Sequence, residues 1–198
     1  MTLSWTVVHA PSPVRALTLA ATDAGLVRVA FGDDPESVAL AAQRLDVEVV
    51  RDGDGVAVAA EQVAEYLDGR RREFTVPLDW RLTAGTQRTV LQALYAHVGY
   101  GKVLGYGELA DLSGAYAGHG YTAARGVGAI MGSNPVPVVV PCHRVVASAG
   151  SRGSGPGRSG PGRSGPGRSG LGGFGGGRAT KEWLLALEGV LPPTLELF

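Results

Sequence analysis

A single residue of the 198 has the chemistry of a strong nucleophile. Cys142 is the only cysteine, and His143 and Arg144 follow it directly in the segment PCHRVV. Apolar surroundings raise the pKa of a thiol, but an adjacent imidazole and guanidinium favour the thiolate, which is the nucleophilic form. A lone cysteine is otherwise a small buried hydrophobe. Between a proline and a His-Arg pair, Cys142 is predicted to be reactive.

A histidine that deprotonates a thiol needs a third group to orient it. Side chains of consecutive residues diverge in an extended chain, so a water bridge between Cys142 and His143 is expected. Five carboxylates in the second half of the chain are candidates for the third group: Glu108, Asp111, Glu182, Glu188 and Glu196. Glu188 follows Leu184 by four residues, at the border of the apolar stripe of a helix predicted over 181–188. It is the candidate best placed for partial burial.

An apolar run and three prolines lead into the cysteine. Val138, Val139 and Val140 are β-branched, which predicts a short buried strand that ends just before Cys142. Asn134 stands before the first proline, and an Asn-Pro pair favours a turn. The nucleophile is therefore expected at the end of a rigid segment.

The elements before this segment have the outline of a helix-turn-helix unit. A helix predicted over 86–98 and a short helix over 106–112 come first. A glycine-rich turn over 113–120 leads to a further helix over 123–132, with Thr122 as its cap.

Arg125 lies in the first turns of the helix predicted over 123–132. It precedes the core-facing Val127 by two residues, about 200° around a 3.6-residue helix, so it points outward. In a helix-turn-helix unit an outward arginine at this place contacts DNA. An ordinary solvated arginine is the alternative that these residues leave open.

The first 82 residues predict a small α/β domain without a chemically active group. The expected elements are a hairpin of strands over 16–20 and 26–31, helices over 36–45 and 59–67, and extended segments over 47–50 and 74–80. The basic run Arg70–Arg72 is assigned to solvated surface.

Composition and charge exclude several classes of function. One cysteine allows neither an internal disulfide nor a multi-cysteine zinc site, and His9, His97 and His119 are expected in the core or on the surface, so no metal or cofactor is predicted. The 18 basic and 18 acidic residues cancel, which excludes a broadly basic nucleic-acid coat or a polybasic membrane anchor. Residues 1–81 hold 8 basic and 13 acidic groups and residues 82–198 hold 10 and 5, so a polyanion would bind the second half.

The free thiol, with neither a secretory leader nor an 18-residue apolar run, predicts a cytoplasmic protein.

Glycine is concentrated in one stretch. Residues 150–177 contain 14 of the 31 glycines and repeat the sequence SGPGR. Such a density of Gly and Pro cannot build a packed core, so a flexible loop is predicted there. Its arginines could contact DNA phosphates, but a tolerated loop expansion is the simpler interpretation.

Several motifs, in order, resemble the O6-alkylguanine-DNA alkyltransferases, also called methylated-DNA–protein-cysteine methyltransferases. PCHRVV, preceded by ARGVGAIMGSN and NPVPVVV, resembles the family's active-site signature. AGTQRTVLQAL, GKVLGYGELA and KEWLLALEG resemble the helix before the helix-turn-helix, its entry and the last helix. The resemblance implies an α/β ribonuclease-H-like N-terminal domain over 1–82. It also implies a mainly α C-terminal domain over 83–198, with a helix-turn-helix (winged-helix-like) unit and the active-site cysteine.

The resemblance also implies catalytic roles. Cys142 would accept the alkyl group, His143 would deprotonate it through a water, and Glu188 would orient the histidine. Asn134 would tie the active-site turn by side-chain hydrogen bonds. Tyr106 would donate to guanine N3 and press on the 3′ phosphate.

Binding roles follow from the same resemblance. Arg125 would fill the space of the flipped guanine, with Thr122, Ala124 and Gly128 on the same DNA-binding helix. The carbonyls of Cys142 and Val145 would accept from the guanine amine. Gly175 and Gly176 would line the base pocket, where a backbone N–H must replace a side-chain donor to O6.

The implied activity is DNA repair by direct reversal. A methyl or alkyl group would pass irreversibly from O6 of guanine, and from O4 of thymine, to Cys142 after base flipping. The implied partner is double-stranded DNA carrying O6-alkylguanine, bound by a monomer without a cofactor or membrane, and cooperative binding along the duplex stays open. A binding module that recognises alkylated bases without repair is the alternative, and Cys142 argues against it. A cysteine hydrolase is disfavoured because adjacent Cys and His have poor geometry for that pair.

Overall fold

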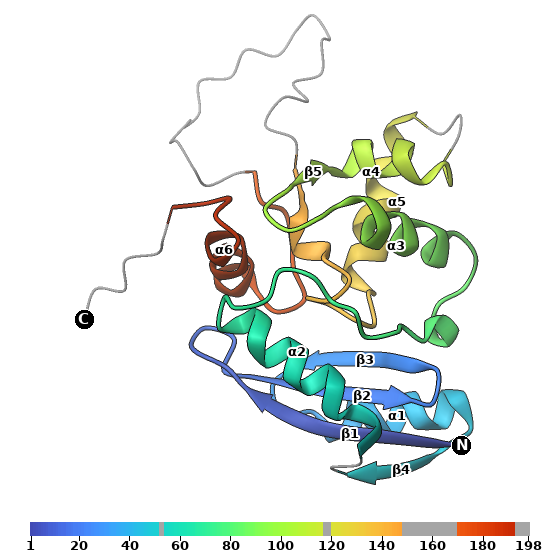
Figure 1. Ribbon diagram of the computed structural model, residues 1–198. Coiled ribbons are helices and arrows are strands. Elements are labelled where there is room, and N and C mark those ends of the chain that lie inside the picture. The colour runs from blue at the N-terminus through green and yellow to red at the C-terminus, as the bar shows by residue number, and fades with distance from the viewer. Residues whose placement is uncertain (52–53, 117–119, 148–169, 193–198) are drawn as a thin grey trace, which may run out of the picture.

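A computed structural model of the protein has two halves, which correspond to the change from predicted strands to predicted helices along the sequence. It describes residues 1–51, 54–116, 120–147 and 170–192. The first half is a four-stranded sheet with two helices, and the second half is mainly helical (Figure 1). The change falls between the 3₁₀ turn η2 (Trp80–Leu82) and α3 (Gly85–His97). None of the described helices is long and apolar enough to cross a bilayer.

The sheet has the strand order β3-β2-β1-β4. The expected hairpin is present as β2 (Ala16–Thr22) and β3 (Gly25–Phe31), and it pairs antiparallel. β4 (Glu48–Arg51) runs parallel to β1 (Thr2–His9). β1 was not predicted, although it is a central strand with β-branched residues and partners on both sides.

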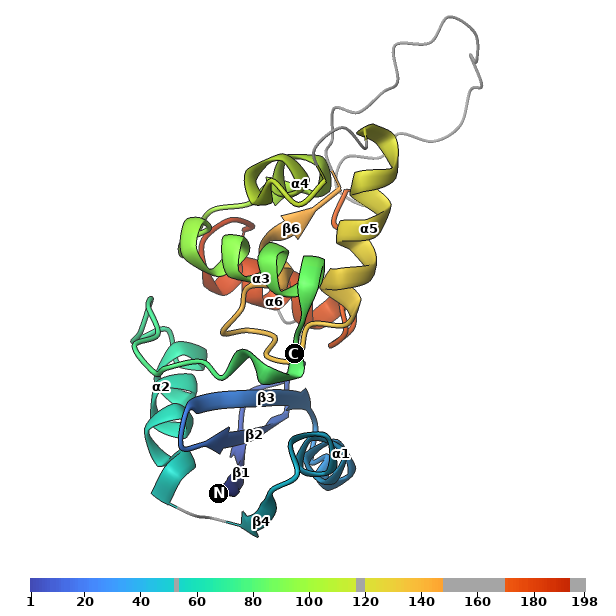
Figure 2. The same ribbon diagram turned by 90° about the vertical axis from the view of Figure 1, so that its right-hand side faces the viewer.

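Each face of the sheet is covered by different elements. α1 (Pro35–Leu45) packs with Leu3, Trp5 and Leu82 on one face. α2 (Ala57–Leu67), which follows the 3₁₀ turn η1 (Asp54–Val56), lies on the other face, and the C-terminal half lies along the β3 edge of the sheet (Figures 1 and 2). The apolar core on that second face is continuous from β2 and β3 to the C-terminal helices.

The segment after α2 does not form the extended edge predicted over 74–80. A single bridge joins Leu78 to Leu26, and the chain then turns into η2. Pro77 removes one N–H from any ladder, while its carbonyl accepts from the Leu26 N–H at 2.8 Å. The linker is therefore attached to β3 without being a strand.

Three helices, α3, α4 (Tyr106–Ser113) and α5 (Gly120–Gly132), pack against one another in the C-terminal half. α5 begins at Gly120 instead of 123, so Thr122 lies inside its first turn and is not the cap. α3 begins at Gly85, one residue before the predicted start, and its N-cap is Ala84. Part of the turn predicted over 113–120 lies outside the described residues.

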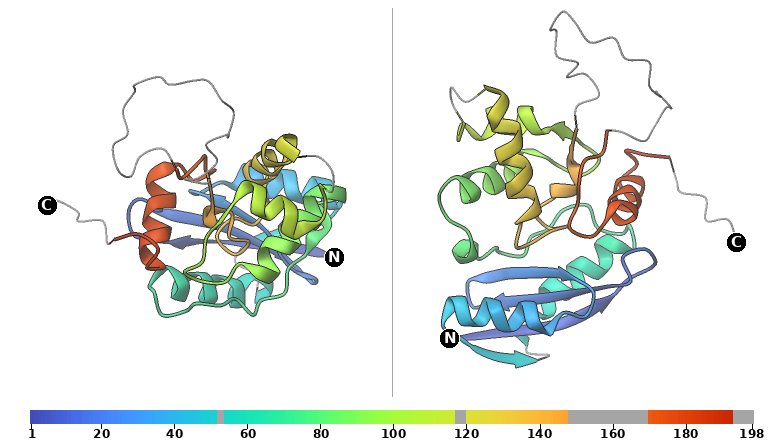
Figure 3. Two further views of the ribbon diagram at one scale, coloured as in Figure 1. Left: turned by 90° about the horizontal axis from the view of Figure 1, so that it is seen from above. Right: turned by 180° about the vertical axis from the view of Figure 1, so that it is seen from behind.

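The last elements are a small parallel pair and one helix. β5 (Leu104–Gly105) pairs with β6 (Val145–Val146), and α6 (Arg178–Leu187) follows. Seen from behind, α5 and α6 lie on either side of the segment that leads into β6 (Figure 3). The SGPGR repeat lies outside the described residues, apart from the end of the predicted loop at 170–177.

Candidate active site

Cys142 begins a 3₁₀ turn, η3 (Cys142–Arg144), and does not follow a strand as predicted. The preceding valines are buried, but they form a tight turn in which Val138 has a φ of 75°. The N–H of Val140 donates to the carbonyl of Val136 at 2.9 Å. Prolines at 135, 137 and 141 have no N–H to give to a neighbouring strand, which explains why the β-branched run does not join a sheet.

Asn134 holds this turn from inside. Its Nδ2 donates to Val140 O at 2.9 Å, and its Oδ1 accepts from Val136 N at 3.0 Å. Both bonds are buried, so losing the amide would leave backbone groups unpaired. The amide fixes the backbone immediately before the cysteine.

Cys142 is nearly buried but borders a cavity. The residue is 4% exposed and lines a cavity of about 300 Å³. Asn134 and Met131 line it from the C-terminal half, Phe31 from β3, and Gly175 from the segment before α6. Both halves of the chain therefore shape the space in front of the nucleophile.

Burial dominates the electrostatics of the thiol. It raises the pKa of Cys142 to about 11, and a hydrogen bond from Asn134 and the charge of Lys181 oppose it only in part. The prediction that His143 and Arg144 favour the thiolate is wrong for the DNA-free protein. At neutral pH the thiol is protonated, so a base must remove its proton.

His143 has the geometry of such a base. Its Nε2 lies 2.8 Å from Oε1 of Glu188, and both side chains are buried. Burial lowers the pKa of His143, so the ring is neutral at pH 7. Since the carboxylate can only accept, Nε2 carries the proton and Nδ1 is the free acceptor. Nδ1 is buried without a hydrogen-bond partner among the described residues.

Glu188 caps α6 and is ionised. Burial would raise its pKa, but hydrogen bonds from His143 and Arg144 outweigh it and lower the pKa to about 2. The Gly101 N–H adds a bond to Oε2 at 3.1 Å. Glu196 lies outside the described residues, and of the other four candidate carboxylates Glu188 is the one that contacts His143.

Arg144 serves the carboxylate and not the thiol. Its guanidinium donates to both oxygens of Glu188, at 2.9 Å from Nη2 and 3.0 Å from Nε, and Nη1 donates to Val98 O at 2.6 Å. The positive charge of Arg144 is therefore paired with Glu188, whereas the sequence had suggested that it would act on the thiol of Cys142.

Lys181 is the cation that acts on the sulfur, although its position in the sequence did not lead to a predicted role. It is fully buried, and burial lowers its pKa to about 8. Its Nζ donates to Val145 O at 2.7 Å and to Leu171 O. Its spacing of three, four and seven residues before Leu184, Leu185 and Glu188 puts it on the inward face of α6, a signal that could have identified it.

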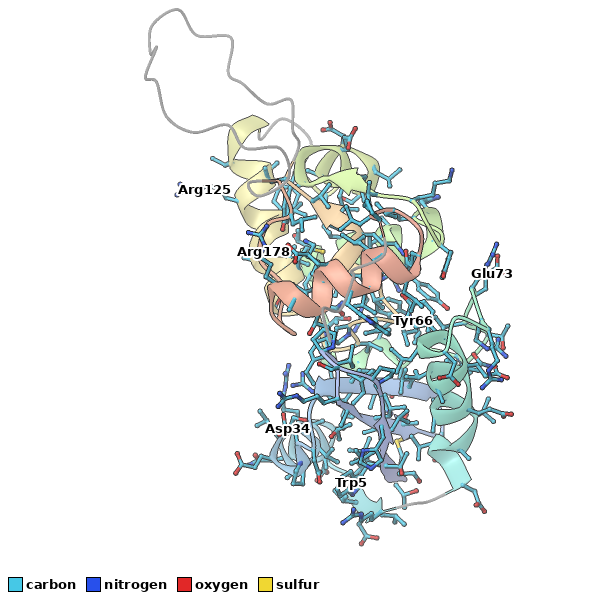
Figure 4. All side chains as sticks on the ribbon, turned by 90° about the vertical axis from the view of Figure 1, so that its left-hand side faces the viewer. Trp5, Asp34, Tyr66, Glu73, Arg125 and Arg178 are labelled. Carbon is cyan, nitrogen blue, oxygen red and sulfur yellow. The ribbon has the colours of Figure 1, made fainter. Side chains whose placement is uncertain are left out.

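Tyr66 on α2 is a second side chain of this network that sequence reasoning missed. Its hydroxyl donates to Oε1 of Glu188 at 2.5 Å and lies 3.4 Å from Nε2 of His143. Figure 4 shows it between the N-terminal half and α6. The helix pattern placed it in the core, but nothing local indicates that a residue 122 positions from Glu188 would contact it.

Tyr106, the first residue of α4, lies beside the segment that precedes α6. Gly172 comes so close that a Cβ there would be 2.5 Å from the Tyr106 hydroxyl. Burial and the charge of Cys142 both raise the pKa of Tyr106, so its hydroxyl stays a donor. The tyrosine is thus near the thiol.

The predicted base-pocket residues lie around the same segment. Gly175 lines the cavity, and Gly176 packs under the Phe31 ring, where a Cβ would be 2.7 Å from the ring. Phe31 also contacts Phe174 at 5.3 Å between ring centroids. The Val145 carbonyl already accepts from Lys181, which leaves one lone pair for a ligand.

The predicted DNA-binding residues lie on α5. Arg125 is exposed and projects away from the body of the protein (Figure 4). Thr122 is exposed too, and Ala124 and Gly128 are half-buried. Gly128 faces Tyr106, since a Cβ there would be 3.9 Å from the ring.

Within residues 1–51, 54–116, 120–147 and 170–192, no three His, Cys, Asp or Glu side chains are grouped to hold a metal ion. The chemistry of the described site is that of a thiol, a neutral imidazole and an ionised carboxylate.

Comparison with known proteins identifies the family. The model of the 6-O-methylguanine DNA methyltransferase ribonuclease-like domain matches residues 6–80, and that of its DNA binding domain matches residues 85–164. The methylated-DNA–protein-cysteine methyltransferase of Mycolicibacterium paratuberculosis is 38% identical over 72% of this chain and 71% of its own. The mouse protein of that name is 33% identical, over 90% of this chain and 79% of its own.

Solved structures agree with these matches. Mycobacterium tuberculosis OGT in complex with DNA has a TM-score of 0.68 and 29% identity, covering 98% of this chain and 96% of that one. The O6-methylguanine-DNA methyltransferase of Pyrococcus kodakaraensis has a TM-score of 0.58 and 25% identity, covering 95% and 99%. With a ribonuclease-like N-terminal domain, a DNA-binding C-terminal domain and Cys142 in its cavity, the chain belongs to the methylated-DNA–protein-cysteine methyltransferase family.

Proposed function

We propose that this protein repairs DNA by direct reversal, moving a methyl or alkyl group from O6 of guanine in double-stranded DNA to the sulfur of Cys142. O4 of thymine is the second substrate we assign. The observation that carries the proposal is the free Nδ1 of His143, held by Glu188, beside a protonated thiol that lines a cavity. The names of the relatives supply the reaction class.

Proton transfer is the first step. The thiol proton passes through a water to Nδ1 of His143, while the Nε2–H stays on the carboxylate side. Glu188 stabilises the imidazolium that forms and does not take its proton, because its pKa is about 2. The charge of Lys181 favours the thiolate at the moment it appears.

Alkyl transfer follows by in-line displacement. The S–C bond forms as the C–O6 bond breaks, and the electron pair of the broken bond stays on the base. A donor to guanine N3 lowers the negative charge that builds up on the ring, and Tyr106 takes this role. In the net reaction the thiol proton replaces the alkyl group on guanine. A thioether has no easy leaving route, so each molecule reacts once.

The alkylated base is hidden in duplex DNA and must be turned out, at about a few kcal/mol. We assign α4 and α5 to a helix-turn-helix, with α5 as the recognition helix. Arg125 occupies the gap left by the base, and Thr122, Ala124 and Gly128 lie along the duplex. The carbonyls of Cys142 and Val145 and the N–H groups of Gly175 and Gly176 bind the flipped guanine.

The remaining assignments concern the two domains, the oligomeric state and the location in the cell. We assign the N-terminal domain to the ribonuclease-H-like fold over 1–82 and the C-terminal domain to 83–198. We take the protein to act as a monomer in the cytoplasm, where a lone thiol stays reduced.

The test is a mass measurement after mixing the protein with duplex DNA that carries one O6-methylguanine. We expect each protein molecule to gain one methyl group in place of a proton, on the peptide that contains Cys142. Cys142→Ala should bind the same duplex without a gain in mass. An unmodified wild-type protein, or many lesions repaired per molecule, would contradict the proposal. Tight binding without transfer by the wild type would favour the non-repairing binding module.

A further inference from the structure

We propose that Tyr66, on α2 of the N-terminal half, is a positioning residue for alkyl transfer, which its hydroxyl supports by fixing Glu188 and, through it, His143. The inference rests on the proposed function, because it concerns the base that activates Cys142. It gives the sheet domain a part in the chemistry as well as in the fold.

The contact is short and fully enclosed. The Tyr66 hydroxyl lies 2.5 Å from Oε1 of Glu188, and the exposed fractions are 0% for Tyr66, 0% for His143 and 5% for Glu188. Burial and the neighbouring carboxylate both raise the pKa of Tyr66, so the hydroxyl keeps its proton and donates. A hydrogen bond from a neutral donor to a buried carboxylate is among the strong ones.

The hydroxyl donates to the same oxygen that receives the His143 proton. Oε1 of Glu188 thus accepts from Tyr66, His143 and Arg144. Arg144 and His143 are both in the C-terminal half, within three residues of Cys142. Of the described groups that donate to Glu188, Tyr66 is the one that comes from the N-terminal half.

Aromatic contacts hold the Tyr66 ring and thereby fix the position of its hydroxyl. Phe74 lies 5.2 Å from the Tyr66 ring centroid, and Tyr100 lies 6.1 Å away in an edge-on arrangement. Because the ring is fixed, the donated bond fixes the carboxylate. A fixed carboxylate keeps the imidazole in the orientation that leaves Nδ1 free.

Removing the Tyr66 hydroxyl should make His143 easier to protonate. By donating to Glu188, the Tyr66 hydroxyl partly neutralises the negative charge of the carboxylate. Without this hydrogen bond the carboxylate attracts the imidazolium more strongly, so His143 binds a proton at higher pH. His143 must be neutral to accept the thiol proton. The acid limb of the pH–rate profile should therefore move to higher pH in Tyr66→Phe.

The experiment compares single-turnover methyl transfer from O6-methylguanine duplex by the full chain and by Tyr66→Phe between pH 5 and 9. We expect a rate about tenfold lower at neutral pH, a part of the roughly 10²–10⁴-fold that general base catalysis supplies, and an acid limb at higher pH. Tyr100→Phe is the matched control, since its hydroxyl donates to the Leu187 carbonyl at 2.8 Å and not to the carboxylate. Its rate and profile should match the wild type.

Two further measurements separate positioning from core packing. If Tyr66 acts through Glu188, Tyr66→Phe should slow Glu188→Gln no further, whereas additive losses would overturn the proposal. Replacement of Tyr66 by 3,5-difluorotyrosine keeps the ring and strengthens the donor, so the acid limb should move to lower pH even if Tyr66→Phe folds poorly. An unchanged limb in both variants also overturns the proposal. A wild type that takes up no methyl group would instead refute the proposed function.

Discussion

Glu188 shows how the chemistry of single residues depends on distant partners. Its carboxylate accepts from Tyr66, from Gly101 and from the adjacent His143 and Arg144, which lie in three separate places in the chain. Local sequence was sufficient to single out Cys142 as the candidate nucleophile and to rank Glu188, which contacts His143, first among five carboxylates. It was insufficient for Tyr66, because a contact across more than a hundred residues leaves no local pattern. It also misassigned Arg144, since adjacency in sequence does not decide which charge a guanidinium meets.

The ionised state of Glu188 predicts a pH-dependent stability. Its folded pKa of about 2 lies below the ordinary 4.5, so the carboxylate stabilises the fold above pH 4.5 and loses this effect as the pH falls towards 2. Glu188→Gln should lower the free energy of unfolding by roughly 3 kcal/mol at pH 7, because it also leaves Arg144 and His143 without a charged partner.

Urea denaturation at a series of pH values checks this expectation. The difference between Glu188→Gln and the wild type should shrink between pH 4.5 and pH 2. Glu182→Gln is the control, since its exposed pair with Arg178 should contribute less than about 1 kcal/mol. A difference that stays constant down to pH 2 would show that Glu188 is not ionised by this network.

At the scale of elements, the described residues 170–177 before α6 contribute Gly175 to the wall of the cavity. Lys181 binds Leu171 O, Phe174 packs on Phe31, and Gly172 touches Tyr106. The sequence predicted α5 and α6 and their inward faces from a 3.6-residue period. It wrongly predicted a strand over Val138–Val140, where the neighbouring prolines enforce a turn. That prediction relied on the apolar β-branched run and neglected the N–H groups that the prolines lack.

Gly172 should be sensitive to substitution, whereas its neighbour should not. Gly172 has a φ of 71°, and a Cβ there would lie 2.5 Å from the Tyr106 hydroxyl. Gly172→Ala should therefore displace Tyr106, slow methyl transfer roughly tenfold and destabilise the fold by about 1 kcal/mol.

Gly173→Ala provides the comparison for this variant. A Cβ on Gly173 would meet no atom of the described residues within 4 Å, so the transfer rate and thermal midpoint of Gly173→Ala should equal those of the wild type. Equal rates in the two variants would mean that the contact between Gly172 and Tyr106 is unimportant for the reaction.

At the scale of the whole molecule, the two halves share one core. Buried residues of β2, β3 and α2 are contiguous with those of α3, α5 and α6, and the Val29 N–H donates to Pro135 O at 2.9 Å across the boundary. The sequence predicted a boundary near residue 82 from a change in pattern. It could not predict how tightly the halves join, since apolar residues that face another domain look like any other core residues.

The shared core predicts that both halves unfold together. Trp5 reports on the sheet and Trp183 on α6, so two variants that each keep one of them, with the other tryptophans changed to Phe, can be followed by fluorescence in urea. Both should have the same midpoint and slope. Two separate transitions would show that the halves are independent folding units.

The order of the chain has a consequence for the newly made protein. α6 follows Cys142 by more than thirty residues, and it carries both Glu188 and Lys181. While the ribosome is still adding this last helix, the thiol has neither an oriented base nor a cation beside it. The chain must therefore be made at least as far as Glu188 before the cysteine can react, which protects the nascent polypeptide from being spent before it can bind a lesion.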